Sequence, residues 1–237
     1  MRVPATRTLG AIVFDFDHTL TDFGRNVEWP KARTELIALY AATGIDTDTV
    51  VRGRGALSVI AALDAAVAQR HSPEYAYATR VEASRILERV EVAGAPRARL
   101  LPGVAALLAE AAAYGLRLAI VSANAESAIR VALGHLGVAD RFTAIVGRDP
   151  CRPLKPEPDQ HREALRLLGC APEAALGIGD STNDVRAAVA AGMLAVGVAG
   201  GESSPEAMLE AGAAFVLADL TAAPVLLALW RTAADDQ

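Results

Sequence analysis

The sequence predicts an α/β fold: a Rossmann-like doubly wound parallel sheet core with an inserted, all-helical cap domain. Three observations lead to this prediction. Short β-type runs alternate with longer helical patterns along most of the 237 residues, which is typical of βαβ units. The expected strands are apolar at successive positions, as in sheets that helices cover on both faces. One long interval, by contrast, contains helical patterns and no convincing strand.

Six strands are expected, the last of them short. Their ranges are Gly10–Phe16, Arg117–Ser122, Ala144–Gly147, Ala175–Gly179, Leu194–Gly197 and Ala214–Leu217. The accompanying helices are expected at Gly103–Tyr114, Ser127–Leu136, Asp159–Leu168, Asp184–Ala191, Pro205–Ala211 and Pro224–Thr232. Because parallel strands point the same way, the residues that follow them should share one edge of the sheet.

The interval without strands predicts a separate domain. Its three helical patterns are Pro30–Thr43, Ser58–Arg70 and Pro73–Val92. We therefore divide the chain into a core, residues 1–21 and 100–237, and a helical cap, residues 22–99, with linkers expected at Thr21–Arg25 and Ala93–Arg99. The insertion follows the carboxyl end of the first strand, where open α/β sheets bind ligands. A domain placed there is positioned to cover a site.

Composition excludes several classes of function. The chain is 52% hydrophobic and 22% charged, which is ordinary for a globular protein and wrong for a disordered one. A net charge of −5 without a block of Lys and Arg argues against nucleic acid as a partner. No apolar stretch reaches the length of a membrane span, and the run from Leu9 to Phe16 is too short for a signal peptide. We expect a cytoplasmic protein.

The two cysteines, Cys151 and Cys170, do not have the spacing of metal ligands. We expect two free thiols in a reducing cytoplasm, and a disulfide is the alternative.

Asp15 and Asp17 form the first candidate site. They come at the end of the first expected strand, with one apolar residue between them. Two carboxylates this close are costly unless a cation or a proton offsets their charge. A hard divalent ion such as Mg²⁺ does so with oxygen ligands. Taken alone, the Asp-x-Asp pattern fits solvated loop residues equally well.

Asp180 and Asp184 form a second candidate pair. They follow the expected strand Ala175–Gly179, where glycine permits a close approach of the backbone. Asp184 also fits a simple helix cap, since acidic residues favour helix N-termini.

Ser122 and Lys155 follow two other strands. Ser122 ends a strand and precedes a helix, where a hydroxyl and free amides make an anion-binding corner; an ordinary N-cap is the alternative. Lys155 lies in a proline-stiffened loop, Arg152–Pro158, and could be held toward the strand ends or be merely solvated.

These elements occur in a fixed order, and the ordered set resembles the haloacid dehalogenase-like hydrolases. Phe14–Leu20 is similar to the first motif of that family, Val121–Ser122 to the second, Lys155–Pro156 to the third and Gly179–Asp184 to the fourth. The resemblance spans nearly the whole chain. A helical cap between the first and second motifs looks like the phosphoglycolate phosphatase-like branch.

The resemblance implies a phosphatase mechanism. Asp15 would attack phosphorus and form an aspartyl-phosphate, and Asp17 would protonate the leaving alcohol and then activate water. Mg²⁺ would be held by Asp15, the backbone carbonyl of Asp17 and Asp180, with Asp184 helping directly or through water.

The resemblance also implies a site for the phosphoryl group. Thr19, Ser122, Ala123 and Asn124 would bind its oxygens, and Lys155 would offset negative charge on both the nucleophile and the phosphoryl group. The partner would be a small phosphorylated metabolite, and the protein a monomer or homodimer.

Asp17 favours phosphate ester hydrolysis over dehalogenation, because a departing halide needs no proton. A sugar phosphomutase would also keep Asp17 and is the alternative enzyme. A non-catalytic phosphoryl-binding module is a further alternative, although Asp15, Asp17 and Asp180 are all present. The chain is too long for a receiver-type signalling domain, and it lacks the phosphate-binding loop of a nucleotide-dependent kinase.

Two features depart from the family pattern or extend it. His18 stands where the family commonly has glycine, and it is either turned away or adds a donor or titrating group near the cap. Arg52 and Arg54, in a glycine-containing segment of the cap, could bind a substrate carboxylate or second phosphate. A loop with solvated arginines explains them equally well.

Overall fold

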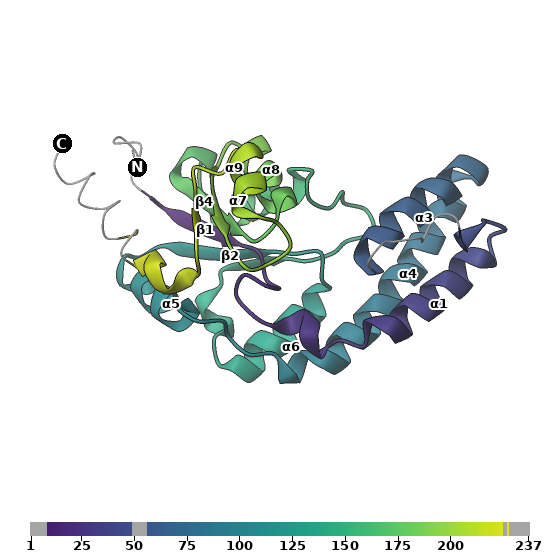
Figure 1. Ribbon diagram of the computed structural model, residues 1–237, viewed down its shortest axis with the longest axis horizontal. Coiled ribbons are helices and arrows are strands. Elements are labelled where there is room, and N and C mark those ends of the chain that lie inside the picture. Colours follow the sequence, from purple (N-terminus) through teal and green to yellow (C-terminus); the bar gives the residue numbers. More distant parts are fainter. Residues whose placement is uncertain (1–8, 49–55, 225–226, 228–237) are drawn as a thin grey trace.

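The computed structural model describes residues 9–48, 56–224 and 227. Its centre is a six-stranded, fully parallel sheet in the order β3-β2-β1-β4-β5-β6, which confirms the predicted α/β fold (Figure 1). The strands are β1 (Ala11–Phe14), β2 (Arg117–Val121), β3 (Ala144–Val146), β4 (Ala175–Gly179), β5 (Leu194–Val198) and β6 (Phe215–Leu217).

The strand order places β1 and β4 side by side in the middle of the sheet. From β1 the chain moves outward to β2 and β3, then crosses over to β4 and continues to the opposite edge. In doubly wound sheets the crevice at this change of direction is where ligands bind. Ile12 pairs with Leu176 and Phe14 with Ile178 across it. The amide of Asp15 donates to the Ile178 carbonyl at 2.8 Å, which extends the pairing to the tip of β1.

Helices cover both faces of the sheet, as the apolar strands predict. Alternate residues of each strand point to opposite faces. Ile12 and Phe14 therefore pack in one buried cluster with α5 (Val104–Ala113) and α6 (Glu126–Leu136). Ala11 and Val13 pack in a second cluster on the other face. The helices of that face are α7 (Asp159–Leu168), α8 (Thr182–Ala190) and α9 (Pro205–Glu210).

The interval predicted to lack strands contains none among its described residues and forms a helical block, residues 23–97. Its helices are η1 (Phe23–Asn26), α1 (Trp29–Ala41), α3 (Ala56–Arg70), α4 (Pro73–Gly94) and η2 (Ala95–Arg97). In Figure 1, α1, α3 and α4 lie together beyond the carboxyl ends of the strands. Tyr40, Leu63 and Leu87, one from each helix, are completely buried.

Both segments expected as linkers contain helical residues. The segment Ala93–Arg99 is helical as far as Arg97, because α4 continues to Gly94 and η2 follows. Gly94 is the last residue of α4 and keeps right-handed helical backbone angles. A side chain at Gly94 would meet the carbonyl oxygen of Asn26 at 2.7 Å, so glycine serves close packing against η1. The predicted linker Thr21–Arg25 likewise overlaps η1.

Other boundaries shift by one or two residues. β1 ends at Phe14, so Asp15 and Phe16 lie just beyond it. α8 begins at Thr182, two residues before the predicted start, because Ser181 caps it in a reciprocal capping box with Asp184. Most of the predicted helix Pro224–Thr232 lies outside the described residues.

Three shorter 3-10 turns complete the described elements: η3 (Ala139–Arg141), η4 (Pro172–Ala174) and η5 (Leu220–Ala222). None of the helices in the described ranges is long and apolar enough to cross a membrane. Cys151 and Cys170 are both free thiols, as predicted.

Candidate active site

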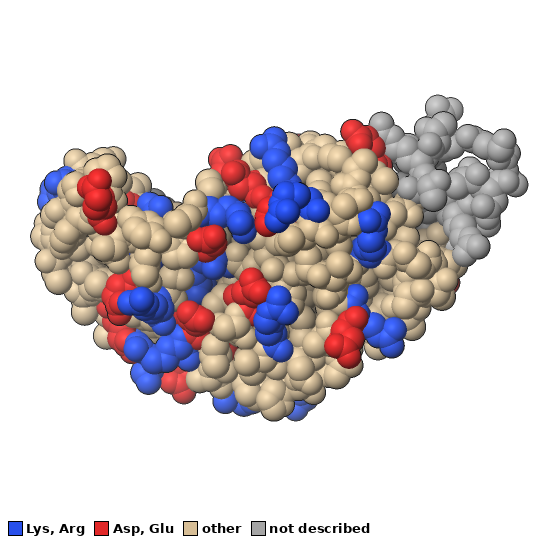
Figure 2. All heavy atoms as spheres, turned by 180° about the vertical axis from the view of Figure 1, so that it is seen from behind, with Lys and Arg blue, Asp and Glu red and all other residues tan. Residues whose placement is uncertain are grey.

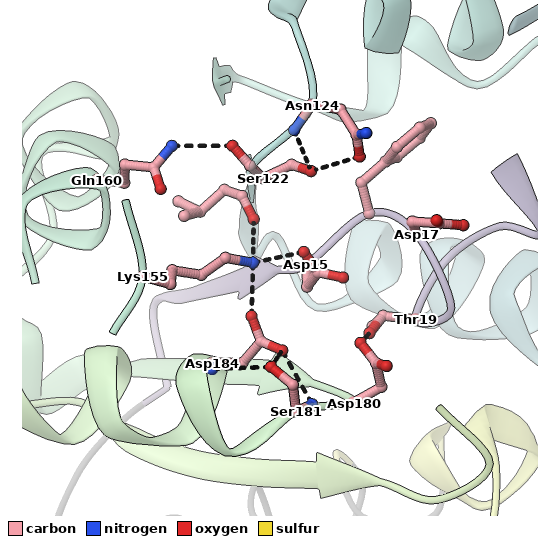
Figure 3. Close-up of polar contacts among 12 residues, drawn as sticks. Asp15, Asp17, Thr19, Ser122, Asn124, Lys155, Gln160, Asp180, Ser181 and Asp184 are labelled. Atoms are coloured by element: carbon pink, nitrogen blue, oxygen red, sulfur yellow. Dashed lines mark hydrogen bonds and ion pairs between the residues drawn. The ribbon is translucent and has the colours of Figure 1, made fainter. Parts of the chain in front are cut away.

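Lys155 connects the first and fourth sequence motifs at the carboxyl edge of the sheet (Figure 3). Its Nζ lies 2.5 Å from Asp15 Oδ1 and 2.5 Å from Asp184 Oδ1, and it donates to the Val121 carbonyl at 3.3 Å. The Lys155 side chain is only 9% exposed. A buried ammonium with three oxygen acceptors is well satisfied, so the stiff loop holds Lys155 toward the strand ends and not in solvent.

Asp180 adds a third carboxylate. One oxygen from each of Asp15, Asp180 and Asp184 lies within 4.8 Å of the others. Asp180 accepts hydrogen bonds from the Thr19 hydroxyl at 3.3 Å and from the Glu202 amide at 2.8 Å. Strand order explains the meeting, because Asp15 follows β1 and Asp180 follows its neighbour β4.

Burial sets the protonation properties of these carboxylates. It raises the pKa of Asp15 well above its ordinary value, against the opposing effect of the Lys155 ammonium. Burial, reinforced by the charge of Asp184, raises the pKa of Asp180 to about 6. Burial also opposes ionisation of Asp184, but Lys155 and hydrogen bonds from Lys155 and Ser181 hold its pKa below the ordinary value.

The charge balance of the cluster is therefore uneven. With all groups ionised, Lys155 offsets one of the three carboxylates. Burial, together with the neighbouring carboxylates, raises the pKa values of Asp15 and Asp180, so ionising all three carboxylates is costly without a further cation. Three carboxylates that can present oxygens to one point form a donor set suited to a hard divalent ion.

The sequence suggested that Asp184 is either a candidate site residue or a helix cap, and its contacts are compatible with both. Its Oδ1 faces Lys155, while its Oδ2 accepts from the Ser181 amide at 3.0 Å and the Ser181 hydroxyl at 2.5 Å. The residue caps α8 and also pairs with the lysine. Gly179 permits this arrangement, since a Cβ there would lie 2.3 Å from the Cβ of Asp184.

Asp17 has a different environment from Asp15. Its Oδ1 accepts hydrogen bonds from the amides of Gly24 at 2.8 Å and His18 at 3.1 Å. Figure 3 shows the Asp17 side chain turned away from Lys155. Burial raises its pKa, opposed by the hydrogen bond from Gly24 and the His18 ring. Asp17 is thus held by η1, the first element of the helical block.

His18 adopts a left-handed backbone conformation with φ of 60°. This conformation favours glycine, which accounts for glycine at this place in the family pattern. The ring lies 3.7 Å from the Asp17 carboxylate (Nε2 to Oδ2) and is about one third exposed.

The segment after β2 forms a tight corner. Ser122 Oγ donates to Asn124 Oδ1 at 2.9 Å and accepts from the Asn124 amide at 3.2 Å. Helix α6 begins at Glu126 with Ala125 as its N-cap, so Ser122 is not the cap. Within the described part of the chain, the Ala123 amide has no hydrogen-bond partner. Ser122 and Ala123 thus offer a hydroxyl and a free amide at one corner.

Three residues whose side chains are buried support this corner and were not identified from the sequence. Gln160 donates to the carbonyls of Ser122 at 2.9 Å and Gly147 at 3.0 Å. Glu91 of α4 and Arg148, two residues beyond β3, form a buried ion pair next to Asn124. Arg148 follows a strand end, which is the same signal that selected Ser122. Glu91 and Gln160 lie in helices and carry no such signal.

A cavity of about 530 Å³ opens between the helical block and the segment that carries Lys155. Asp64, Arg80 and Ser84 line it from α3 and α4, and Arg148 and Lys155 line it from the sheet domain. Figure 2 shows the surface hollowed between the two parts, with Lys and Arg side chains along the hollow. Arg52 and Arg54 lie outside the described residues.

Comparison with known proteins places this chain in a family. Residues 9–192 match the model of the haloacid dehalogenase-like hydrolases. The chain is 33% identical over 209 residues to phosphoglycolate phosphatase of Rhodospirillum rubrum, and the alignment covers 86% of each chain. It is 36% identical over 109 residues to phosphoglycolate phosphatase of Escherichia coli K12, spanning 43% of that protein and 46% of this chain.

Solved structures agree on the fold. The crystal structure of CbbY from Rhodobacter sphaeroides in complex with phosphate has a TM-score of 0.61 at 25% identity and covers 90% of this chain and 96% of that chain. β-Phosphoglucomutase from Clostridium difficile has a TM-score of 0.67 at 21% identity and covers 95% of this chain and 98% of that chain. With the family model matching most of the sequence, the chain belongs to the haloacid dehalogenase-like hydrolases.

Proposed function

We propose that this protein is a Mg²⁺-dependent phosphatase that hydrolyses a small-molecule phosphate monoester through an aspartyl-phosphate on Asp15. The observation that supports it best is the buried cluster in which Lys155 joins Asp15 and Asp184 beside Asp180. Asp15 is a carboxylate nucleophile at a strand tip, with a cation already facing one oxygen. The family and a phosphatase relative aligned over 86% of the chain support the same reaction class.

The nucleophilic step needs a charged Asp15 close to a charged phosphoryl group. Lys155 reduces the repulsion between them, because its ammonium lies 2.5 Å from Asp15 Oδ1. Mg²⁺, held by Asp15, the backbone carbonyl of Asp17 and Asp180, would supply the remaining positive charge. Asp184 serves mainly to hold Lys155, since both of its oxygens already accept hydrogen bonds.

The phosphoryl oxygens would bind at the corner after β2. The Ala123 amide has no acceptor among the described residues and can donate, and the Ser122 hydroxyl can rotate from Asn124 Oδ1 to a phosphoryl oxygen. Donors fixed by backbone geometry stabilise charge that develops in the transition state without having to reorganise. Asn124 keeps Ser122 in place through its amide, and Thr19 steadies Asp180.

Asp17 is proposed as the acid and base. Its raised pKa suits a carboxyl group that donates a proton to the leaving alcohol and later accepts one from water. To do so it must leave the amides of Gly24 and His18, which now hold its Oδ1. A rotation of the Asp17 side chain toward Asp15 would release it from these amides.

The test is hydrolysis of p-nitrophenyl phosphate with and without Mg²⁺. Wild-type protein should release phosphate only with the metal, and Asp15→Asn should abolish the reaction. Asp140→Asn, which removes an exposed carboxylate on η3, is the matched control and should retain full activity. Full activity of Asp15→Asn would refute the proposed nucleophile.

A substrate panel then defines the specificity, beginning with phosphoglycolate and sugar phosphates. Conversion of a sugar 1-phosphate to its 6-phosphate without release of phosphate would assign the chain to the phosphomutases. Binding of phosphate without any turnover would indicate a non-catalytic module.

A further inference from the structure

Glu91 is a carboxylate with no exposed surface, near the end of α4. A buried carboxylate is tolerated only when it is paired and hydrogen-bonded. Its Oε1 accepts from Asn124 Nδ2 at 3.1 Å, and its Oε2 accepts from the Ala125 amide at 3.0 Å. Arg148 completes the set with one nitrogen to each oxygen, at 2.9 Å and 2.8 Å. Glu91 therefore has four donors and is fully satisfied.

Arg148 connects the same corner to the helical block. It donates to the Ala123 carbonyl at 2.7 Å and, from its own amide, to the Asn124 carbonyl at 2.8 Å. On the other side it donates to the hydroxyl and the carbonyl of Ser84 in α4. The planar guanidinium matches the carboxylate in a bidentate pair, a geometry that lysine cannot reproduce.

These contacts determine which groups of the corner remain available. The Ala125 amide donates to Glu91 and the Asn124 amide donates to Ser122. Among the residues that the structure describes, the Ala123 amide has no acceptor and remains available to donate. Glu91 also fixes the side chain of Asn124, because the Nδ2 of that amide must face a carboxylate. The Asn124 Oδ1 then faces the Ser122 hydroxyl.

The ion pair also affects the electrostatics of the corner. A carboxylate without its partner, next to a corner that binds a phosphoryl group, would repel the substrate. Arg148 neutralises Glu91 at the point of contact. The corner thus gains the fixed acceptors of a carboxylate without its net negative charge.

We propose that Glu91 and Arg148 are a positioning pair: they orient the anion-binding corner at residues 122–125 and keep it electrically neutral toward the phosphoryl group. This proposal rests on the proposed phosphatase function and adds a contribution from α4, in the helical block, to phosphate binding. Neither residue touches the phosphoryl group; both act through Ser122, Ala123 and Asn124.

The test compares wild type, Arg148→Met and the double variant Arg148→Met/Glu91→Gln in two readouts, kcat/KM for an aryl phosphate and the inhibition constant for inorganic phosphate. Arg148→Met leaves the Glu91 carboxylate buried without its cation, although the donors from Asn124 and Ala125 remain. It should lower kcat/KM by about a hundredfold and raise the phosphate inhibition constant by about tenfold. Adding Glu91→Gln removes the negative charge but keeps an acceptor for Asn124 or Ala125. The double variant should return to within about tenfold of wild type in kcat/KM.

Ser127→Ala is the matched control. It removes the hydrogen bond from Ser127 to Glu88, which also joins α6 to α4 but does not reach the corner. It should leave the phosphate inhibition constant unchanged. Arg148→Lys keeps the charge without the bidentate geometry and should fall between wild type and Arg148→Met. Thermal unfolding with Mg²⁺ reports whether each variant is folded.

The proposal is overturned if folded Arg148→Met has the same phosphate inhibition constant as wild type. It is also overturned if kcat/KM of the double variant is as low as that of Arg148→Met, since packing alone would then explain the loss. Should Arg148→Met fail to fold, Arg148→Lys and the double variant give the same comparison. Wild-type protein without turnover would refute the phosphatase proposal instead. Calorimetric binding of inorganic phosphate to wild type, Arg148→Met and the double variant would then decide the positioning role.

Discussion

Two buried cations on one segment, Lys155 and Arg148, face carboxylates in different ways. Lys155 lies between Asp15 and Asp184 at the tips of the central strands, with Asp180 beside them. Arg148 faces Glu91 alone, between the sheet and α4. The first cluster has one cation for three carboxylates, whereas the second has one for one.

This difference separates a site for chemistry from a site for positioning. An excess of buried carboxylates costs free energy, and it is tolerated where a cation or a reacting group offsets their charge. A balanced, fully hydrogen-bonded pair needs nothing more and holds its neighbours in place. The flexible point charge of lysine suits the first task, and the planar fork of arginine suits the second.

The largest effect is expected from Lys155→Met. The reaction loses the cation that faces the nucleophile, so kcat/KM should fall by about 10²- to 10³-fold. Three carboxylates then remain without the Lys155 cation, and breaking a buried pair typically destabilises a protein by about 3–5 kcal/mol. Steady-state kinetics and chemical unfolding in EDTA measure the two effects.

Mg²⁺ sharpens the contrast between the two clusters. It should restore much of the lost stability of Lys155→Met, because a cation that binds the folded state shifts the unfolding equilibrium. Mg²⁺ should not restore the stability of Arg148→Met, because the carboxylate left without a cation there is Glu91, which lies outside the metal cluster. Equal rescue of both variants by Mg²⁺ would show that the two regions are not electrically distinct.

A second prediction concerns pH in the absence of metal. Burial raises the folded-state pKa of Asp180 to about 6 from 3.8, so between these values the folded state binds more protons than the unfolded state. Stability contributed by protonated Asp180 is therefore lost as pH rises from about 4 to about 6, by up to about 3 kcal/mol.

His161 opposes this trend over nearly the same range. Burial, helped by Lys155, lowers its pKa to about 4, so its contribution to stability rises with pH. The Asp180 effect is consequently measured as a difference between wild type and Asp180→Asn. The variant should gain stability relative to wild type as pH rises from 4 to 6 in EDTA. Saturating Mg²⁺ should remove that gain, and a constant difference across this pH range would contradict the assigned cause.

The two regions also differ in how far the sequence could predict them. Asp15, Ser122, Lys155 and Asp180 follow strands, and parallel strands bring their ends to one edge whatever the details of packing. The structure places all four at that edge, with Lys155 bonded directly to Asp15. What the sequence could not supply was the pairing of Lys155 with Asp184, because that depends on the course of a loop.

Glu91 shows where such reasoning stops. In the sequence it is one of several charged residues in a long helical pattern, like Glu88 three residues earlier. One of the two is completely buried against the corner after β2 and the other is not, since burial depends on how α4 packs against α6. Periodicity predicts that a helix exists; it does not predict which polar residue of that helix is enclosed.

The smallest effect is expected from Gly201→Ala. A Cβ at this position would lie 1.9 Å from Asp180 Oδ2 and 2.4 Å from the Asp180 Cβ. Asp180 must therefore move, and the hydrogen bond from the Glu202 amide moves with it. Displacing a ligand through its surroundings commonly lowers metal affinity by about tenfold or more. We expect the Mg²⁺ concentration for half-maximal activity to rise by about tenfold.

Gly201→Ala and Arg148→Met should then give opposite patterns. Gly201→Ala should raise the Mg²⁺ requirement and leave the phosphate inhibition constant at saturating Mg²⁺ unchanged. Arg148→Met should raise the phosphate inhibition constant and leave the Mg²⁺ requirement unchanged. Gly134→Ala is the control, because a Cβ there meets no atom within 4 Å. If Gly201→Ala weakened phosphate inhibition at saturating Mg²⁺, the carboxylate cluster would itself be shaping the corner after β2. The division between a chemical and a positioning region would then have to be abandoned.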